Sequence, residues 1–219
     1  SLFTNSRVQW ERTFNICWGG VYLGTRIFLP MLQQADAGHI INTSSVNGFW
    51  ASLGPTVPHT AYSAAKFAVK GFTEALMTDL RINAPHIKCS VVMPGHIGTS
   101  IMSNSRKVQH GSDSDALDQV EIEQVRGRLV AGGVDVSQIS DDDIQKMAAE
   151  RARTFLEDAP MTAAAAAKVI LDGVKAERWR ILVGQDAELL DKWVRDAPEG
   201  AYEPGFHARF AVEAGWKLG

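Results

Sequence analysis

Long stretches of the chain carry apolar residues at intervals of three and four positions, and this spacing predicts helices. The clearest stretches are residues 8 to about 34, with glycines at positions 19, 20 and 24, and residues 60–76. Glycine weakens a helix, so we expect another backbone to pack closely against those three positions. Further helices are predicted at residues 117–129, 141–157, 163–176 and 186–195, with Ser140 and Thr162 as N-caps of the second and third.

Short apolar runs between the helices end in hydroxyl residues or glycine and predict buried strands. These runs are residues 39–43, 87–94 and 178–183. Strands that alternate with helices indicate an α/β domain with a parallel sheet, here of about three strands, in which residues 39–43 could lie at an edge. Ligands of such sheets bind at the carboxyl ends of the strands, where Ser44 and Ser45 fall.

The composition limits the classes of function. A length of 219 residues suits one domain, and a net charge of −3 with mixed signs favours neither nucleic acid nor a membrane as a partner. The two cysteines do not make a disulfide framework, and no secretory signal or long apolar run is present, so we expect a cytoplasmic protein. The six histidines are scattered, and no metal site is expected.

Tyr62 and Lys66 are the first candidates for chemistry. They are four positions apart on a predicted helix, which places them on one face. A phenol with an ordinary pKa of about 10 transfers protons poorly at neutral pH, and a neighbouring ammonium favours the phenolate. The pair therefore predicts acid–base catalysis, and the alternative is a surface helix that carries both residues by chance.

Three motifs follow one another along the chain in a recognisable order. They are Asn42-Thr43-Ser44-Ser45, Tyr62-x-x-x-Lys66 and Pro94-Gly95-x-Ile97-x-Thr99. With these motifs the chain resembles the carboxyl-terminal two-thirds of a short-chain dehydrogenase/reductase, closely over residues 8–100 and loosely beyond. The resemblance implies a single three-layer, Rossmann-like α/β domain over residues 1–219. Its core would comprise residues 8–100 and 162–195, and a variable lid would occupy about residues 101–160.

The resemblance also implies roles for individual residues. Ser45 would hydrogen-bond the substrate oxygen, Tyr62 would give or take the proton, and Lys66 would lower the pKa of Tyr62 and hold the nicotinamide ribose. The nicotinamide end of NAD or NADP would contact Tyr62, Lys66, Pro94, Gly95, Ile97 and Thr99. The substrate would be a small alcohol or carbonyl compound. Its pocket is expected to include Val46, Asn47, Trp50 and His96. The helices at residues 8–34 and 60–76 would assemble a homodimer or homotetramer.

Some of these expectations have alternatives. The loop at residues 49–59 should be ordered without being helical, and it could shape the substrate pocket or simply cover the core. His59 and His96 could approach the pocket, although ordinary loop histidines are the simpler interpretation. Cys17 stands where the family carries an asparagine that wires a proton relay to the lysine. A thiol cannot replace an amide's hydrogen bonds, so Cys17 is interpreted as a small buried hydrophobic residue and the relay as weakened.

The glycine-rich turn that binds pyrophosphate in the family, Thr-Gly-x-x-x-Gly-x-Gly, does not occur in the sequence, nor does Asn-Asn-Ala-Gly. The N-terminal strands of the fold are therefore expected to be missing or truncated, and the cofactor could be absent. A longer or cleaved chain, a completing partner subunit and a true short variant all remain open.

Three functions compete. The first is an NAD(P)-dependent oxidoreductase that interconverts an alcohol and a ketone or aldehyde. The second is a cofactor-independent hydrolase or lyase that reuses Ser45, Tyr62 and Lys66. The third is a non-catalytic scaffold. The three ordered motifs favour the first function.

Overall fold

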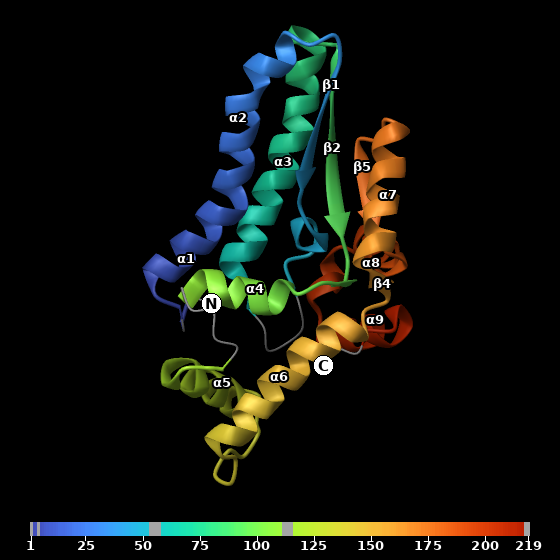
Figure 1. The fold of residues 1–219 in the computed structure, drawn as a ribbon. Helices are drawn as coiled ribbons and strands as arrows, with labels where there is room; N and C mark the ends of the chain where they lie inside the picture. Colours follow the sequence, from blue (N-terminus) through green and yellow to red (C-terminus); the bar gives the residue numbers. More distant parts are fainter. Residues whose placement is uncertain (1, 4, 53–57, 111–115, 217–219) are drawn as a thin grey trace.

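The fold is taken from a computed structural model that describes residues 2, 3, 5–52, 58–110 and 116–216 (Figure 1). Residues 53–57, within the loop that the sequence predicts to be ordered, lie outside the described part. The prediction for that loop is therefore addressed only at its two ends.

Three strands form a parallel sheet in the order β1-β2-β5. They are β1 (Gly38–Thr43), β2 (Ile87–Pro94) and β5 (Arg180–Val183). Thr43 lies opposite Val92 and Pro94 lies opposite Val183, so the carboxyl ends of the strands meet at one edge of the sheet. Within the described residues β1 is an outer strand. The predicted α/β class with a parallel sheet is confirmed.

Helices cover both faces of the sheet, as Figure 1 shows. On one face lie α1 (Arg7–Phe14), α2 (Gly20–Gln33) and α3 (Thr60–Asn83), and on the other lies α7 (Ala163–Lys175). Ile40 and Cys89 pack with Leu76 and Leu80 of α3, whereas Val92 and Ile181 pack with α7. Successive strand residues point to opposite faces, so the two clusters form the two halves of a three-layer core. The predicted three-layer architecture is confirmed.

The first predicted helix contains an irregular turn. A capping box at Ser6 starts α1, a π-helical turn occupies Asn15–Gly19, and α2 then continues to Gln33 with Pro30 inside it. A Cβ built at Gly19, Gly20 or Gly24 would meet no atom within 4 Å in the described structure. Within the described residues no backbone packs closely on these glycines, so the expected close approach stays a prediction for a partner chain. Gly20 and Gly24 instead face an open groove.

The chain between β2 and α7, where the resemblance predicts a lid, is largely helical and lies below the sheet (Figure 1). It contains α4 (Ile101–His110), α5 (Gln119–Ala131) and α6 (Asp141–Glu157). Ser140 caps α6 in a capping box, and Thr162 caps α7, as predicted. Two short strands, β3 (Ile97–Gly98) and β4 (Met161–Thr162), pair in parallel and join the two ends of the lid. Neither α4 nor this pair is predicted from the sequence, because the region is polar and has no clear period.

The C-terminal segment packs on the body beside the end of β1. It comprises α8 (Gln185–Asp196), a 3-10 turn η3 (Glu199–Tyr202) and α9 (Phe206–Ala214). Together with the 3-10 turn η2 (Val46–Gly48), these elements build a core around Trp50, Leu190 and Phe210. No helix within the described residues has the length and hydrophobicity needed to cross a bilayer.

Candidate active site

Ser45 lies directly after β1, at the edge where the strands end. The neighbouring Ser44 anchors this turn, because its backbone N–H donates to the Val92 carbonyl at 2.8 Å and its hydroxyl donates to the Lys66 carbonyl at 2.7 Å. Gly48 permits the close approach to α3, since a Cβ there would lie 2.9 Å from the Lys66 carbonyl oxygen. The turn that carries Ser45 is therefore fixed against the helix that carries Tyr62 and Lys66.

Ser45, Tyr62 and Lys66 come together in the structure. The Ser45 hydroxyl group lies close enough to the Tyr62 phenol to lower the pKa of the phenol. The Lys66 ammonium lies 5.5 Å from the centre of the Tyr62 ring, and it donates a 3.0 Å hydrogen bond to the Thr43 carbonyl. Residues four apart on α3 thus share one face, and that face meets the carboxyl end of β1.

Burial has the largest effect on the protonation equilibria of Tyr62 and Lys66. Burial raises the pKa of Tyr62 above its ordinary value, and the nearby Ser45 hydroxyl group only partly opposes this. Burial thus sets the direction of the shift in the protein without ligands, and the expected lowering by Lys66 stays a prediction. Burial lowers the pKa of Lys66 itself. The ammonium donates its hydrogen bond to the Thr43 carbonyl.

Cys17 lies beside Lys66, at the position where a relay residue is expected. It belongs to the π-helical turn and is half-buried. Burial raises the pKa of the thiol, while the nearby Lys66 ammonium acts in the opposite direction. The half-buried thiol agrees with the interpretation of Cys17 as a small hydrophobic residue. The role of this position in a relay stays a prediction.

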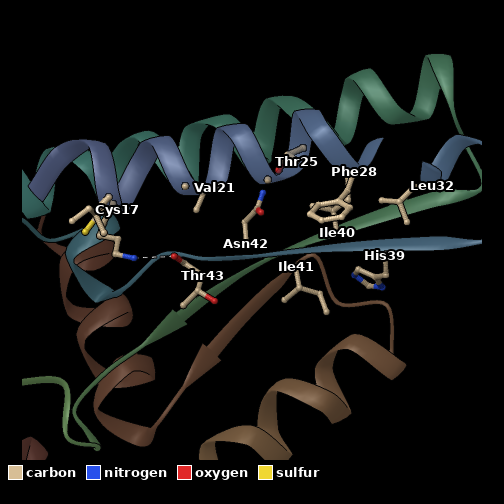
Figure 2. Close-up of a pocket in the computed structure, with 14 residues that line it drawn as sticks. Cys17, Val21, Thr25, Phe28, Leu32, His39, Ile40, Ile41, Asn42 and Thr43 are labelled. Carbon is tan, nitrogen blue, oxygen red and sulfur yellow. Dashed lines mark hydrogen bonds between the residues drawn. The ribbon is translucent and has the colours of Figure 1, made fainter. Parts of the chain in front are cut away.

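An open groove of about 610 Å³ runs between α2 and β1 and ends at Cys17, Thr43 and Lys66. Figure 2 shows Val21 and Phe28 of α2 pointing toward the strand, with Cys17 at one end of the groove. The groove lies along the outer edge of β1, and its lining is mostly apolar. The Lys66 side chain lies at this end of the groove. Its ammonium group is 5.5 Å from the Tyr62 ring, so the groove ends beside Tyr62.

The segment expected to hold the nicotinamide follows β2. Pro94 is the last residue of β2, and the Gly95 N–H donates to the Val183 carbonyl at 3.0 Å. Ile97 belongs to β3 and packs on the core beneath α7, and Thr99 is half-buried beyond it. Because β1 and β2 are neighbours, this segment and Ser45 leave the same end of the sheet.

The four residues expected in the substrate pocket are all buried. Val46 and Trp50 are 3% and 1% exposed and pack under α8 and α9, and the Trp50 indole donates to the Ala201 carbonyl at 2.8 Å. Asn47 is 2% exposed and donates to the Ser63 hydroxyl and the Trp50 carbonyl. His96 is 4% exposed. The Trp50 side chain therefore packs in the core in this structure, which agrees with the expectation that its loop covers the core.

Two neighbours of the site were given no definite role from the sequence. The Thr43 carbonyl accepts from Lys66, and a backbone oxygen leaves no signal in a sequence pattern. The His59 ring lies edge-on to Tyr62, 6.1 Å between centres, and burial lowers its pKa. A histidine directly before the first turn of α3 was the available signal for this contact.

Comparisons with known proteins point to one family. A model of the short chain dehydrogenase family matches residues 3–110. SadH of Mycobacterium tuberculosis (strain H37Rv), whose name describes it as an oxidoreductase, is 31% identical over 185 residues, which are 84% of this chain and 53% of SadH. Cyclopentanol dehydrogenase of Comamonas testosteroni is 39% identical over 95 residues, which are 43% of this chain and 35% of that enzyme. The chain thus spans about half the length of SadH.

A solved structure gives the same fold. It is a short chain dehydrogenase/reductase from Burkholderia phymatum in complex with NAD, with a TM-score of 0.65 at 24% identity over 93% of this chain and 63% of that chain. The family model covers the segment that carries Ser45, Tyr62, Lys66 and the residues after β2. Residues 3–110 of the chain therefore match the short-chain dehydrogenase/reductase family.

Proposed function

We propose that the protein is an NAD(P)-dependent oxidoreductase that interconverts an alcohol and a ketone or aldehyde, with Tyr62 as the acid/base. The observation that carries this proposal is the proximity of the Ser45 hydroxyl group to the Tyr62 phenol, with Lys66 one helical turn away on the same face of α3. A catalytic acid or base must lie within hydrogen-bond reach of the reacting oxygen, and two adjacent hydroxyl groups provide that reach.

The residues at the end of the sheet fit the nicotinamide half of the cofactor. Lys66 presents an ammonium at the end of the groove, and Pro94, Gly95, Ile97 and Thr99 follow the neighbouring strand. When bound there, the nicotinamide would supply or accept the hydride. The 219 residues contain no glycine-rich turn for the pyrophosphate, so these residues are assigned to the nicotinamide end alone. The relative with NAD in its structure supports this choice of cofactor.

Each side chain has a distinct task in the proposed reaction. Ser45 would donate a hydrogen bond from its hydroxyl group to the carbonyl oxygen and so polarise the carbonyl carbon. Tyr62 would give its proton to the same oxygen in reduction and take it back in oxidation. The Lys66 ammonium is held on the Thr43 carbonyl in this structure. Hydroxyl groups of a bound ligand would draw it nearer to the Tyr62 phenol, where its positive charge would lower the pKa of the phenol. The cyclopentanol dehydrogenase among the relatives supports a small, partly apolar alcohol as the substrate class.

The proposal is tested first by titrating the purified protein with NADH and NADPH and following nicotinamide fluorescence. Saturable binding in the micromolar range is expected. Ketones and alcohols are then assayed with the protein and with Tyr62→Phe, which removes the phenol proton but keeps the ring. We expect the variant to lose roughly 10²–10⁴-fold in kcat/KM.

Lys66→Met serves as a second variant, and Tyr202→Phe serves as a matched control, because Tyr202 lies on the C-terminal segment and its hydroxyl accepts from the Ala51 N–H. Wild-type protein that is folded by circular dichroism but binds neither cofactor at millimolar concentration would sink the proposal. Equal activities for Tyr62→Phe and Tyr202→Phe would remove Tyr62 from the mechanism.

The same resemblance leads us to propose a homodimer or homotetramer built on α2 and α3. Leu23, Ile27 and Met31 of α2 are 54%, 65% and 66% exposed, and Phe67 of α3 is 42% exposed. Apolar side chains that cluster on exposed helix faces favour burial against a partner. Light scattering at micromolar concentration tests this, and Ile27→Asp should shift the protein to monomer.

A further inference from the structure

Asp186 is a buried carboxylate that joins three parts of the chain. It is 2% exposed, and its Oδ2 accepts from the His96 N–H at 2.6 Å and from the Trp216 indole N–H at 2.8 Å. As the second residue of α8 it lies near the positive end of the helix dipole, which favours its charge. Asp186 thus fixes the backbone of the segment that follows β2.

The backbone around Asp186 is built to admit this carboxylate. A Cβ at Gly95 would lie 2.2 Å from Asp186 Oδ2, and a Cβ at Gly184 would lie 2.2 Å from Oδ1. Gly184 also has a φ of +110°, a conformation that other residues rarely adopt. The ends of β2 and β5 therefore close around one side chain, and the position of His96 follows from this packing.

The His96 side chain continues the connection to the lid. Its Nε2 lies 2.8 Å from the Phe155 carbonyl oxygen, and its ring centre lies 4.4 Å from that of Phe155. A carbonyl only accepts, so Nε2 carries the proton. Phe155 is in the last turn of α6, where helix carbonyls lack partners within the helix. His96 therefore satisfies a backbone group that α6 leaves unpaired.

A second contact ties the same two segments. A Cβ at Gly98 would lie 2.5 Å from the Leu156 carbonyl oxygen, so the backbone of β3 packs directly on the last turn of α6. His96 and Gly98 alternate with Ile97 and Thr99, the residues proposed to hold the nicotinamide. Any shift of this turn of α6 must therefore be shared by the nicotinamide segment.

We propose that His96 and Asp186 are positioning residues that lock the nicotinamide segment, residues 97–99, to the last turn of the lid helix α6. The contact with the cofactor rests on the proposed function above, whereas the mechanical link rests on the contacts in the structure. The last turn of α6 and residues 97–99 then move as one unit, so a ligand that fixes these residues also restrains α6.

The test uses two amide substitutions at one position. His96→Gln places an N–H close to the position of Nε2 and can still reach the Phe155 carbonyl, whereas His96→Asn carries the same group on a shorter side chain and cannot. His207→Asn is the matched control, because the His207 ring, like that of His96, packs edge-on to the Trp216 ring, but among the described residues its Nε2 has no hydrogen-bond partner. Hydrogen exchange is measured on peptides spanning residues 95–103 and 152–160, together with NADH binding by fluorescence.

We expect His96→Asn to raise exchange roughly tenfold in both peptides, about the effect of losing one buried hydrogen bond, and to weaken NADH binding by a similar factor. His96→Gln should restore both, and His207→Asn should leave both at wild-type values. Asp186→Ala should raise exchange in the first peptide most, while Asp186→Asn, which keeps an acceptor oxygen, should recover much of the protection.

Unchanged exchange in His96→Asn, or a change confined to one of the two peptides, would overturn the link. Coupled exchange with unaltered NADH affinity would overturn the positioning role. If the wild-type protein binds no NADH, the proposed function fails while the exchange comparison still decides whether α6 and residues 97–99 move together. Should His96→Asn fail to fold, the Asp186→Ala and Asp186→Asn pair decides the same question.

Discussion

Replacing Trp50 with phenylalanine separates a packing role from a place in the substrate pocket. The indole is 1% exposed, contacts the rings of Phe206 and Phe210 with centres 5.5 and 6.0 Å away, and donates to the Ala201 carbonyl. Losing that donor leaves a buried carbonyl unsatisfied, which costs about 1–3 kcal/mol. The smaller ring leaves a void that costs about 1 kcal/mol more. We therefore expect Trp50→Phe to lower the free energy of unfolding by about 2–4 kcal/mol.

Urea unfolding followed by far-ultraviolet circular dichroism measures this loss. With a slope of about 1–3 kcal/mol per molar urea, the midpoint should fall by on the order of 1 M. Trp179→Phe is the control, since Trp179 is 43% exposed, and surface changes of this kind stay within about 0.5 kcal/mol. The packing argument fails if both variants share the wild-type midpoint. A changed KM in Trp50→Phe at unchanged stability would place the indole in the pocket instead.

Three further predictions concern the site and the core. Because the Ser45 hydroxyl group lowers the pKa of Tyr62, Ser45→Ala should move the ultraviolet phenolate titration to higher pH, and an unmoved or lower midpoint would contradict the assignment. Burial raises the pKa of Tyr62 above its unfolded value of about 10, so this proton contributes stability at lower pH that is lost as pH rises through the folded pKa. In Gly173→Ala the new Cβ would lie 2.8 Å from a side chain of β5, which should lower the free energy of unfolding by about 1–3 kcal/mol. Gly71→Ala meets open space on α3 and should raise the free energy of unfolding by about 0.5–1 kcal/mol. Urea midpoints that move in the same direction for both variants would refute the packing argument. Burial raises the pKa of the Cys17 thiol, so alkylation at neutral pH, followed by mass spectrometry, should be slower than for a free thiol and should accelerate with pH.

The elements with a clear period could be predicted from the sequence because their local pattern and their packing agree. The helix around Tyr62 and Lys66 buries one face, and its spacing already brings the two residues together. The strands before Ser45 and Pro94 are short apolar runs, and hydroxyl or glycine residues end them. The carboxyl-end rule for parallel sheets then places both motifs at one edge.

The local pattern gives no information about burial by distant segments. Trp50 lies close to Ser45 in the chain, which suggested the pocket, yet helices about 150 residues later bury it. The direction of the Tyr62 pKa shift likewise depends on desolvation, and the contact that holds Lys66 is a backbone carbonyl. Such effects arise from tertiary packing and leave no periodic signal.

The sequence by itself determined the α/β class, the parallel strands and the approach of Ser45, Tyr62 and Lys66, because each depends on residues that are near in the chain or on a general rule of sheets. Tertiary structure alone decided which of the residues near Ser45 in the chain are buried and which face the groove. It also decided that Asp186 and His96 tie the segment after β2 to the lid. Their partners lie 90 and 59 residues away along the chain, at distances over which spacing carries no information about contact.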